Sequence, residues 1–291
     1  MNNKDYPALF QSADKASRQA QTKYIIINLS YIILIILGIL CELLSFYYHM
    51  ISIVSAFLFI TALLCVFIML VKKYENNRYA YRTLAESVKT ATWRFIMCTE
   101  PFKKSYDFSE VKSRFRSVLR DIIRHNTFIT NYINGTYSEK NQITEKMLNI
   151  RDLSFKERKK IYIDQRIENQ IKKYSQQYTL NKQRILTGFI IVISCNILAV
   201  IFTLIKITIG SNQYLSINIL VIIMAVSALT WIHFKKYQEL ASSNKLAAHE
   251  IEVIKGFSEE IKTEKDFSDF VINAEKAFSR KYTQWVVNKI K

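Results

Sequence analysis

Two long apolar blocks dominate the pattern of hydrophobic and polar positions along the chain. The first block covers residues 24–71 and contains one fixed charge, Glu42, and the second covers residues 185–234 and contains one, Lys206. A hydrocarbon core of about 30 Å is crossed by about 20 helical residues, so each block is long enough for two crossings. Because backbone polar groups find no water inside a bilayer, the crossings are predicted to be helices.

The blocks divide into four predicted spans with two short turns. The spans are Tyr24–Phe46, Ile51–Val71, Ile185–Ile205 and Tyr214–Phe234. A signal peptide is excluded for the first block, because its apolar stretch is too long and no small-residue cleavage site follows it. The pattern therefore predicts two membrane hairpins.

The polar remainder of the chain also has a helical period. After the second span, apolar residues fall at helical spacing up to Pro101, which is expected to end that helix. The residues of this stripe are Tyr81, Leu84, Val88, Ala91 and Phe95. A second amphipathic helix is predicted from about Phe108 to Tyr132, with Val111, Phe115 and Leu119 on its apolar side.

Two further helices are predicted on either side of the second block. Ser154 and Glu157 have the spacing of a capping box, and the helix that they begin is expected to run directly into the third span. The tail from Lys235 to Lys291 is expected to be helical with a break near Gly256. The predicted fold class is an all-α membrane protein, with four transmembrane helices in two hairpins and long cytoplasmic amphipathic helices.

The chain also repeats itself. Lys72-Lys73-Tyr74-Glu75 follows the second span and Lys235-Lys236-Tyr237-Gln238 follows the fourth, at an offset of 163 residues. A two-span unit returns to its starting side, so two copies would be parallel repeats. The alternative is that any two hairpins with basic exits look alike. The predicted division is a first two-span unit (1–105), a basic connector (106–153) and a second two-span unit (154–291).

Charge sets the expected orientation. Of the 65 fixed charges, 63 lie outside the two apolar blocks, and the chain has a formal net charge of +17. Residues 72–184 contain 25 basic and 12 acidic residues, whereas the two short turns contain no Lys or Arg. Basic segments stay on the cytoplasmic side of a membrane, so both termini and the middle segment are predicted to be cytoplasmic.

The sequence offers no pattern typical of an enzyme. The closest two of the five glycines are 22 residues apart, which excludes a dinucleotide fingerprint and a P-loop. The four histidines show no metal-ligand spacing, and the four cysteines include no C-x-x-C pair. We therefore expect no catalytic residues, no metal and no cofactor.

A few polar positions inside the spans are candidates for a pore or a polar membrane face. Asn28, Gly38 and Glu42 share one stripe of the first span, and a second stripe lies on the third span at Asn196, Thr203 and Lys206. Ionisable residues within spans commonly mark ion pathways, and opposite charges at one height can pair or form a ring in an oligomer. The alternative is ordinary helix packing, with the two charges reaching to the interface.

A basic face is predicted on the second amphipathic helix. Its cations recur every four residues at Lys112, Arg116, Arg120 and Arg124. Such a face can bind anionic headgroups, a phosphorylated ligand or RNA, or it can be a solvated surface near anionic lipid. Lipid is the favoured partner, and nucleic acid is not expected.

Two segments carry a resemblance to a known family. Residues 6–21, Tyr-Pro-Ala-Leu-Phe-Gln-Ser-Ala-Asp-Lys-Ala-Ser-Arg-Gln-Ala-Gln, lead into the first span. Residues 82–95, Arg-Thr-Leu-Ala-Glu-Ser-Val-Lys-Thr-Ala-Thr-Trp-Arg-Phe, follow the first hairpin and precede Glu100-Pro101-Phe102. Together they resemble the SLATT family, the two-span effector domains associated with SMODS nucleotidyltransferases and SLOG domains in bacteria. The second half resembles the family in its architecture of two spans and a charged helix.

The resemblance implies a function and partners. It implies an effector of anti-phage or other conflict systems that forms a pore or perturbs the membrane. We expect it at the bacterial inner membrane as a homo-oligomer, because a single bundle of four spans is too thin to enclose a hydrated channel. The trigger would be a nucleotide signal or a signal-generating partner protein. The alternatives are a non-conducting membrane anchor or scaffold that recruits a cytoplasmic partner, and a constitutive ion channel.

Overall fold

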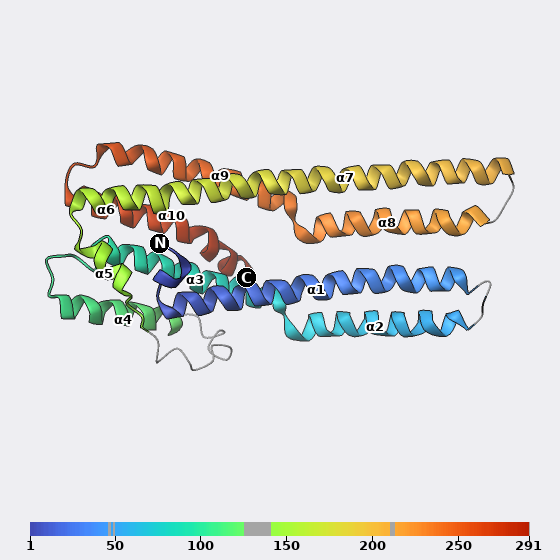
Figure 1. Cartoon of the computed structure of the whole chain (residues 1–291), viewed down its shortest axis with the longest axis horizontal. Helices are drawn as coiled ribbons and strands as arrows, with labels where there is room; N and C mark the ends of the chain where they lie inside the picture. Colours follow the sequence, from blue (N-terminus) through green and yellow to red (C-terminus); the bar gives the residue numbers. More distant parts are fainter. Residues whose placement is uncertain (46–47, 49, 125–140, 210–212, 291) are drawn as a thin grey trace. The chain divides into compact units, whose positions relative to one another are not determined.

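The computed structural model of the chain describes residues 1–45, 48, 50–124, 141–209 and 213–290, and these contain helices and no strand. Its helices are α1 (Ala8–Leu44), α2 (Ile51–Lys72), α3 (Tyr74–Ile96), α4 (Phe108–Arg124), α5 (Glu145–Asp152), α6 (Phe155–Tyr162), α7 (Asn169–Ile209), α8 (Gln213–Lys235), α9 (Tyr237–Gly256) and α10 (Glu264–Ile290) (Figure 1). A π-helical segment, Ile163–Glu168, joins α6 to α7, and short 3-10 turns lie at Asn3–Asp5 and Phe257–Glu260.

The chain forms two compact units. Unit 1 consists of residues 1–23, 74–173 and 247–291, and unit 2 consists of residues 24–73 and 174–246. Three helices, α1, α7 and α9, run from one unit into the other. The division predicted from the sequence, with boundaries after residues 105 and 153, consists of continuous segments of the chain. It stays a prediction.

Unit 2 contains the two predicted hairpins, α1 with α2 and α7 with α8 (Figure 1). All four helices are long and apolar enough to cross a membrane. Large apolar side chains cover their outer faces, among them Phe57 at 67%, Leu63 at 69% and Ile207 at 73% exposure. The four predicted spans and the all-α membrane class are therefore confirmed.

A glycine allows a close helix contact within each hairpin. A Cβ on Gly38 of α1 would lie 2.7 Å from the ring of Phe59 on α2. A Cβ on Gly188 of α7 would lie 2.6 Å from the side chain of Ile232 on α8. Small residues let membrane helices approach closely, so both glycines serve the packing of their hairpins.

Helix α3 forms the centre of unit 1. The stripe predicted for it is buried in full, from Tyr81 at 6% exposure to Phe95 at 0%. The ring of Phe95 packs on the ring of Phe115 from α4 at 4.6 Å between centroids, and Trp93 packs edge-on against Tyr162 from α6 at 5.7 Å. Burial of these aromatic side chains contributes apolar stabilisation to the unit.

The predicted helix on the basic segment is present as α4 from Phe108 to Arg124. The predicted continuation to Tyr132 lies outside the described residues. Its apolar side is buried as predicted, with Val111 and Phe115 at 0% and Leu119 at 4% exposure.

The predicted capping box is also present. The Ser154 hydroxyl accepts a hydrogen bond from the Glu157 amide, and the Glu157 carboxylate accepts one from the Ser154 amide at 3.0 Å. From there α6, the π-helical segment and α7 follow one another without a break, as predicted, although the π-helical segment was not expected. The tail breaks at Gly256, also as predicted, where α9 ends and a 3-10 turn begins.

The internal repeat has structural counterparts at the same offset of 163 residues. Lys73 and Lys236 each separate a spanning helix from its exit helix, and both adopt the left-handed backbone region, with φ of 44° and 50°. Ala62 of α2 and Ala225 of α8 are both buried, at 1% and 6% exposure. The buried faces of α3 and α9 correspond too, at Tyr81 and Asn244, Ala85 and Ala248, and Val88 and Ile251.

We predict that glycine at either left-handed lysine stabilises the protein. A side chain costs about 1 kcal/mol in the left-handed region, and glycine does not carry that cost. Lys73→Gly and Lys236→Gly are each expected to raise the free energy of unfolding by about 1 kcal/mol, as measured by denaturation in detergent. Lys72→Gly, one residue earlier in the helix, is the matched control and should lower it. A loss of stability at both left-handed positions would contradict the prediction.

Candidate functional site

One carboxylate in unit 1 collects hydrogen bonds from three other elements. Glu275 of α10 is fully buried, at 0% exposure. Its Oε1 accepts from the Tyr162 hydroxyl at 3.0 Å and from Arg166 Nε at 2.8 Å. Its Oε2 accepts from Arg166 Nη2 at 2.7 Å and from the Thr90 hydroxyl at 2.9 Å. These four residues are called the Glu275 cluster, which joins α3, α6, the π-helical segment and α10.

The guanidinium of Arg166 is held in a dry environment. It is 1% exposed, and its carbon atom lies 4.8 Å from the centroid of the Phe278 ring. Burial opposes its charge, but the two bonds to Glu275 outweigh burial and raise the pKa of Arg166. Its third nitrogen, Nη1, is buried and has no hydrogen-bond partner among the described residues. Burial, followed by the Glu275 charge, also raises the pKa of Tyr162.

The spacing of buried residues explains why the helix contains a π turn here. Arg158, Tyr162, Arg166 and Gln170 follow at intervals of four and are at most 4% exposed. Four residues of α-helix turn by about 400°, so a stripe with this spacing drifts by about 40° per step, or about 120° over three steps. A π turn holds one residue more than an α turn and takes up about 100° of that drift. The π-helical segment thus keeps all four side chains on the buried face.

A second buried ionic group lies in the same unit. Arg82 of α3 bonds to Asp14 of α1 at 3.1 Å and to Glu86 at 2.5 Å. The i, i+4 spacing of Arg82 and Glu86 is typical of an ion pair on a helix surface, but Glu86 is buried, at 3% exposure. Burial acts to raise the pKa of Glu86, and the charges of Arg82 and neighbouring cations outweigh it and lower that pKa to about 2.

Two lysines belong to the same group. Burial lowers the pKa of Lys89 to about 8, and it also lowers the pKa of Lys173. Lys89 lies 5.6 Å from the ring centroid of Tyr6, whose hydroxyl accepts a hydrogen bond from the Trp93 indole at 3.0 Å. The interior of unit 1 therefore combines an aromatic core with a network of charges that are mostly paired.

In the first hairpin, the predicted polar residues mainly make contacts within the hairpin. The Glu42 carboxylate accepts a hydrogen bond from the hydroxyl of Ser55 on α2 at 2.5 Å. Asn28 donates to the carbonyl of Tyr24 in its own helix at 2.8 Å. Gly38 is buried against α2. Ser55 was not predicted as a site residue, although it is 2% exposed.

The second hairpin has a matching polar bond. Asn218 of α8 donates to the hydroxyl of Thr203 on α7 at 2.9 Å. Asn218 and Ser55 are 163 residues apart, so the α2 and α8 partners of the two bonds occupy equivalent positions in the repeat. Asn196 donates to the carbonyl of Val192 at 2.8 Å, and its side chain is exposed. Lys206 is half-buried and forms no ion pair with Glu42 or any other described residue.

The basic face of α4 is present on its surface. Arg116, Arg120 and Arg124 are exposed and Lys112 is half-buried. None of the four forms an ion pair with a described residue, whereas the neighbouring Arg114 binds Glu110 at 2.6 Å. A surface hollow of about 670 Å³ is lined by Phe108, Ser109, Lys112, Ser113, Arg116, Ser117 and Arg120. Unpaired cations beside hydroxyl groups make this face suited to phosphate oxygens.

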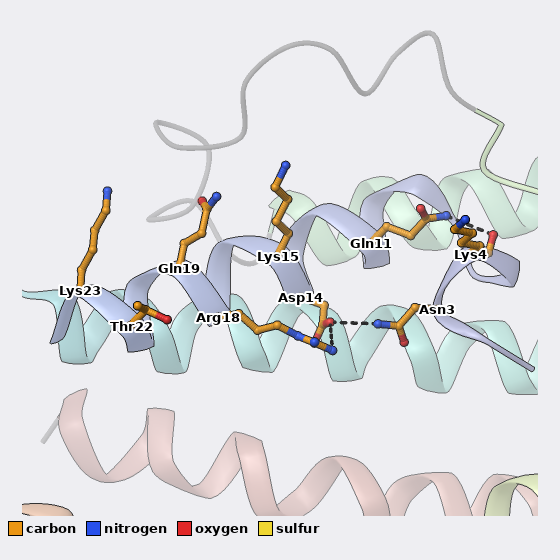
Figure 2. A pocket seen from close by; sticks show the side chains of 9 residues that line it. All are labelled: Asn3, Lys4, Gln11, Asp14, Lys15, Arg18, Gln19, Thr22 and Lys23. Atoms are coloured by element: carbon orange, nitrogen blue, oxygen red, sulfur yellow. Dashed lines mark hydrogen bonds and ion pairs between the residues drawn. The ribbon is translucent and has the colours of Figure 1, made fainter. Parts of the chain in front are cut away.

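A second surface hollow follows the first part of α1. It measures about 690 Å³ and is lined by Asn3, Lys4, Gln11, Asp14, Lys15, Arg18, Gln19, Thr22 and Lys23 (Figure 2). Asp14 is bonded to Arg18 at 2.8 Å and to Asn3 at 3.3 Å, while Lys15, Gln19 and Lys23 extend away from it. Its one carboxylate is engaged in ion pairs with Arg18 and Arg82.

Among the described residues, no group of three or more His, Cys, Asp or Glu side chains could hold a metal ion.

The Glu275 cluster is the main feature of the site that the sequence did not predict. The one sequence signal for the cluster is that Arg158, Tyr162, Arg166 and Gln170 recur every four residues. Two arginines, a tyrosine and a glutamine at this spacing do not form the apolar stripe that is typical of a buried helix face.

Comparison with known proteins gives two matches, one for each half of the chain. Residues 7–159 match the family described as SMODS and SLOG-associating 2TM effector domain 3, and residues 162–285 match the one described as SMODS and SLOG-associating 2TM effector domain 1. Each matched range contains one hairpin, which confirms the tandem arrangement. No curated protein and no solved structure matches the chain.

We predict strong energetic coupling between Arg166 and Glu275. Removing one partner leaves a buried charge unpaired, so Arg166→Met or Glu275→Leu alone should each lower the free energy of unfolding by about 3–5 kcal/mol. The double variant should lose much less than the sum, because neither charge then remains.

The exposed pair of Glu110 and Arg114 is the matched control. Its coupling, measured in the same way by denaturation in detergent, should be about 0.5 kcal/mol. Equal coupling in the two cycles would show that the buried pair has no special role.

Proposed function

Because the chain belongs to the SLATT family of SMODS and SLOG-associating 2TM effector domains, we propose that it forms a pore or perturbs the bilayer when it is triggered from the cytoplasm. It is a multi-pass membrane protein with two effector domains of a family associated with conflict and defence systems. The proposal concerns how this effector acts, where it lies and what it binds.

The observation that carries the proposal is the exposed amide of Asn196. It lies near the middle of the third span and bonds only to a carbonyl of its own helix, at 2.8 Å, among the bonds of the described residues. Polar groups within a span face protein or water rather than lipid. An interface between copies or a water-filled path satisfies that requirement. We therefore propose a homo-oligomer in which this face of α7 is covered by another copy or lines water.

Several copies are needed for conduction. Two hairpins contribute four spanning helices, which are too few to enclose a hydrated path comfortably. The Glu42–Ser55 hydrogen bond joins the two helices of the first hairpin, and the Thr203–Asn218 hydrogen bond joins those of the second. Both bonds place polar atoms inside the spans. In an oligomer these polar positions supply hydrogen-bonding groups along a path for ions or water.

We propose the bacterial inner membrane as the location, with both termini in the cytoplasm. The basis is the concentration of Lys and Arg in residues 72–184, which contain 25 of the 41 basic residues of the chain. In this orientation unit 1 is cytoplasmic, where a nucleotide signal or a signal-generating protein is accessible. The activity is non-catalytic and uses no cofactor in this proposal.

The basic face of α4 is proposed to bind anionic headgroups. Each Lys or Arg near an anionic surface contributes about 1 kcal/mol, and the four cations of this face have no acidic partner among the described residues. Phosphate oxygens provide the same chemistry in lipids and in nucleotide signals. We propose the lipid as the source, because the chain is a membrane protein.

The first test is membrane potential in bacteria after induced expression. We expect rapid depolarisation followed by growth arrest for the parent protein. Asn196→Leu, which removes the exposed amide, should reduce the depolarisation, and so should Glu42→Ala and Lys206→Ala if those charges line the path. Ile197→Leu, at the next exposed position of the same helix, is the control and should behave like the parent.

A normal potential in the parent at high expression has two readings, a missing trigger or a non-conducting scaffold. Repeating the measurement during phage infection, with the native neighbouring genes present, separates them. A potential that stays normal under both conditions would overturn the proposal and favour the scaffold. Depolarisation by all three variants at the parental level would reject the sites and leave the class intact.

The lipid assignment is tested by counting bound anionic lipid. Arg116→Gln with Arg120→Gln should weaken retention of phosphatidylglycerol in detergent by roughly tenfold or more, because two contributions of about 1 kcal/mol are lost. Native mass spectrometry measures the retained lipid, and Arg114→Gln is the control, since that cation already has a partner. Unchanged retention in the double variant would exclude the lipid.

A further inference from the structure

We infer that the π-helical segment is a register switch held by the Glu275 cluster. When Glu275 leaves Arg166, the segment relaxes to α-helix, and the part of α7 that follows turns by about 100° about its own axis. The inference deepens the proposed function and rests on it, because it specifies how a cytoplasmic event reaches the second hairpin.

The first step is that tertiary contacts, rather than local preference, maintain the π turn. Extended π-helical turns are rare and occur frequently at functional sites. This one extends from Ile163 to Glu168 and contains Arg166, whose burial it makes possible by keeping the four-residue stripe on one face. Without Glu275, the buried guanidinium would be an unpaired charge, and the conformation that buries it would lose its main support.

The second step is that the cluster is incompletely satisfied. Arg166 Nη1 is buried and has no partner among the described residues, while the other two guanidinium nitrogens bind Glu275. A buried donor without a partner destabilises the state that contains it, so less free energy is needed to leave this state. Water can satisfy that nitrogen once the side chain turns outward.

The third step is that the restraint on the helix comes from other segments of the chain. Glu275 lies on α10, 109 residues after Arg166. Helix α10 also places Phe267 and Phe270 edge-on against Tyr162, at 6.0 and 6.1 Å between ring centroids. On the outer side, Lys255 of α9 binds Glu168 at 2.8 Å. Displacement of α10 thus acts directly on the segment that precedes the third span.

The consequence is confined to the second hairpin. Helix α1, which leads into the first span, is α-helical without interruption from Ala8 to Leu44 and so has no extra residue to release. On relaxation of the π turn, α7 residues move by one register position, about 100° and 1.5 Å. Gln170, now 4% exposed, would turn out of the core, and Asn196 would turn with the same continuous helix.

The test uses the full chain with its four cysteines replaced and one reporter cysteine introduced. Gln170→Cys reports on the position just after the π-helical segment, and Ile150→Cys, which is equally buried at 4% exposure, reports on the fold of unit 1. Labelling with a maleimide is compared with and without Glu275→Gln. We expect the cysteine at position 170 to react roughly tenfold faster or more in Glu275→Gln, and the cysteine at position 150 to stay protected.

A deletion makes the test specific to helix register. Deletion of the exposed Asp164 removes the extra residue of the π turn, so the helix becomes α-helical with Gln170 still on its buried face. In this background Glu275→Gln should no longer accelerate labelling. Membrane depolarisation should change in the same way as labelling. Glu275→Gln should increase it, and Glu275→Gln combined with the deletion should depolarise cells at the parental level.

The outcomes separate this inference from the proposed function. Faster labelling at position 170 alone, reversed by the deletion, supports the switch. If no variant depolarises cells, that result rejects only the proposed function. Labelling at both reporter positions means that unit 1 unfolds, and labelling at neither means that the π turn is permanent. Either result overturns the inference, as does acceleration that persists after the deletion.

Discussion

The ion pair between Arg166 and Glu275 is the interaction on which unit 1 depends. The two carboxylate oxygens of Glu275 accept four hydrogen bonds. The donors come from α3, α6 and the π-helical segment. A buried carboxylate that lost these donors would cost several kcal/mol, so the four elements hold one another in place. Helix α10, which is far from the others in the sequence, is thereby fixed beside the helix that leads into the third span.

The two hairpins are repeats, and the repeat explains both their similarity and their difference. Ser55 and Asn218 place a polar bond at equivalent positions, and Lys73 and Lys236 place a left-handed residue at equivalent exits. The lead-in helices differ, because α1 is uninterrupted whereas α7 follows a π turn. The two hairpins thus share the part that must fit a bilayer and differ in how each is connected to unit 1.

The sequence predicts the features that depend on local pattern. The length and composition of the apolar blocks indicate four spans, because a bilayer imposes a minimum helix length. The stripe from Tyr81 to Phe95 indicates a buried face, because the period of a helix is fixed. The Arg166–Glu275 pair joins residues 109 positions apart, and no local pattern contains that information. The Arg82–Glu86 pair shows the same limit, since its spacing predicts the partner and not the burial.

A charged pair suits a switch better than an apolar contact of the same size. Apolar contacts weaken gradually as surfaces separate, since their energy follows the area removed from water. A buried ion pair has no comparable intermediate, because a charge that has lost its partner inside the protein is penalised until it reaches water. Replacing such a pair with packed apolar side chains often leaves a protein equally stable or more so, which means that stability alone does not account for it. In the proposed register switch, an all-or-none contact of this kind would confine the response to two states.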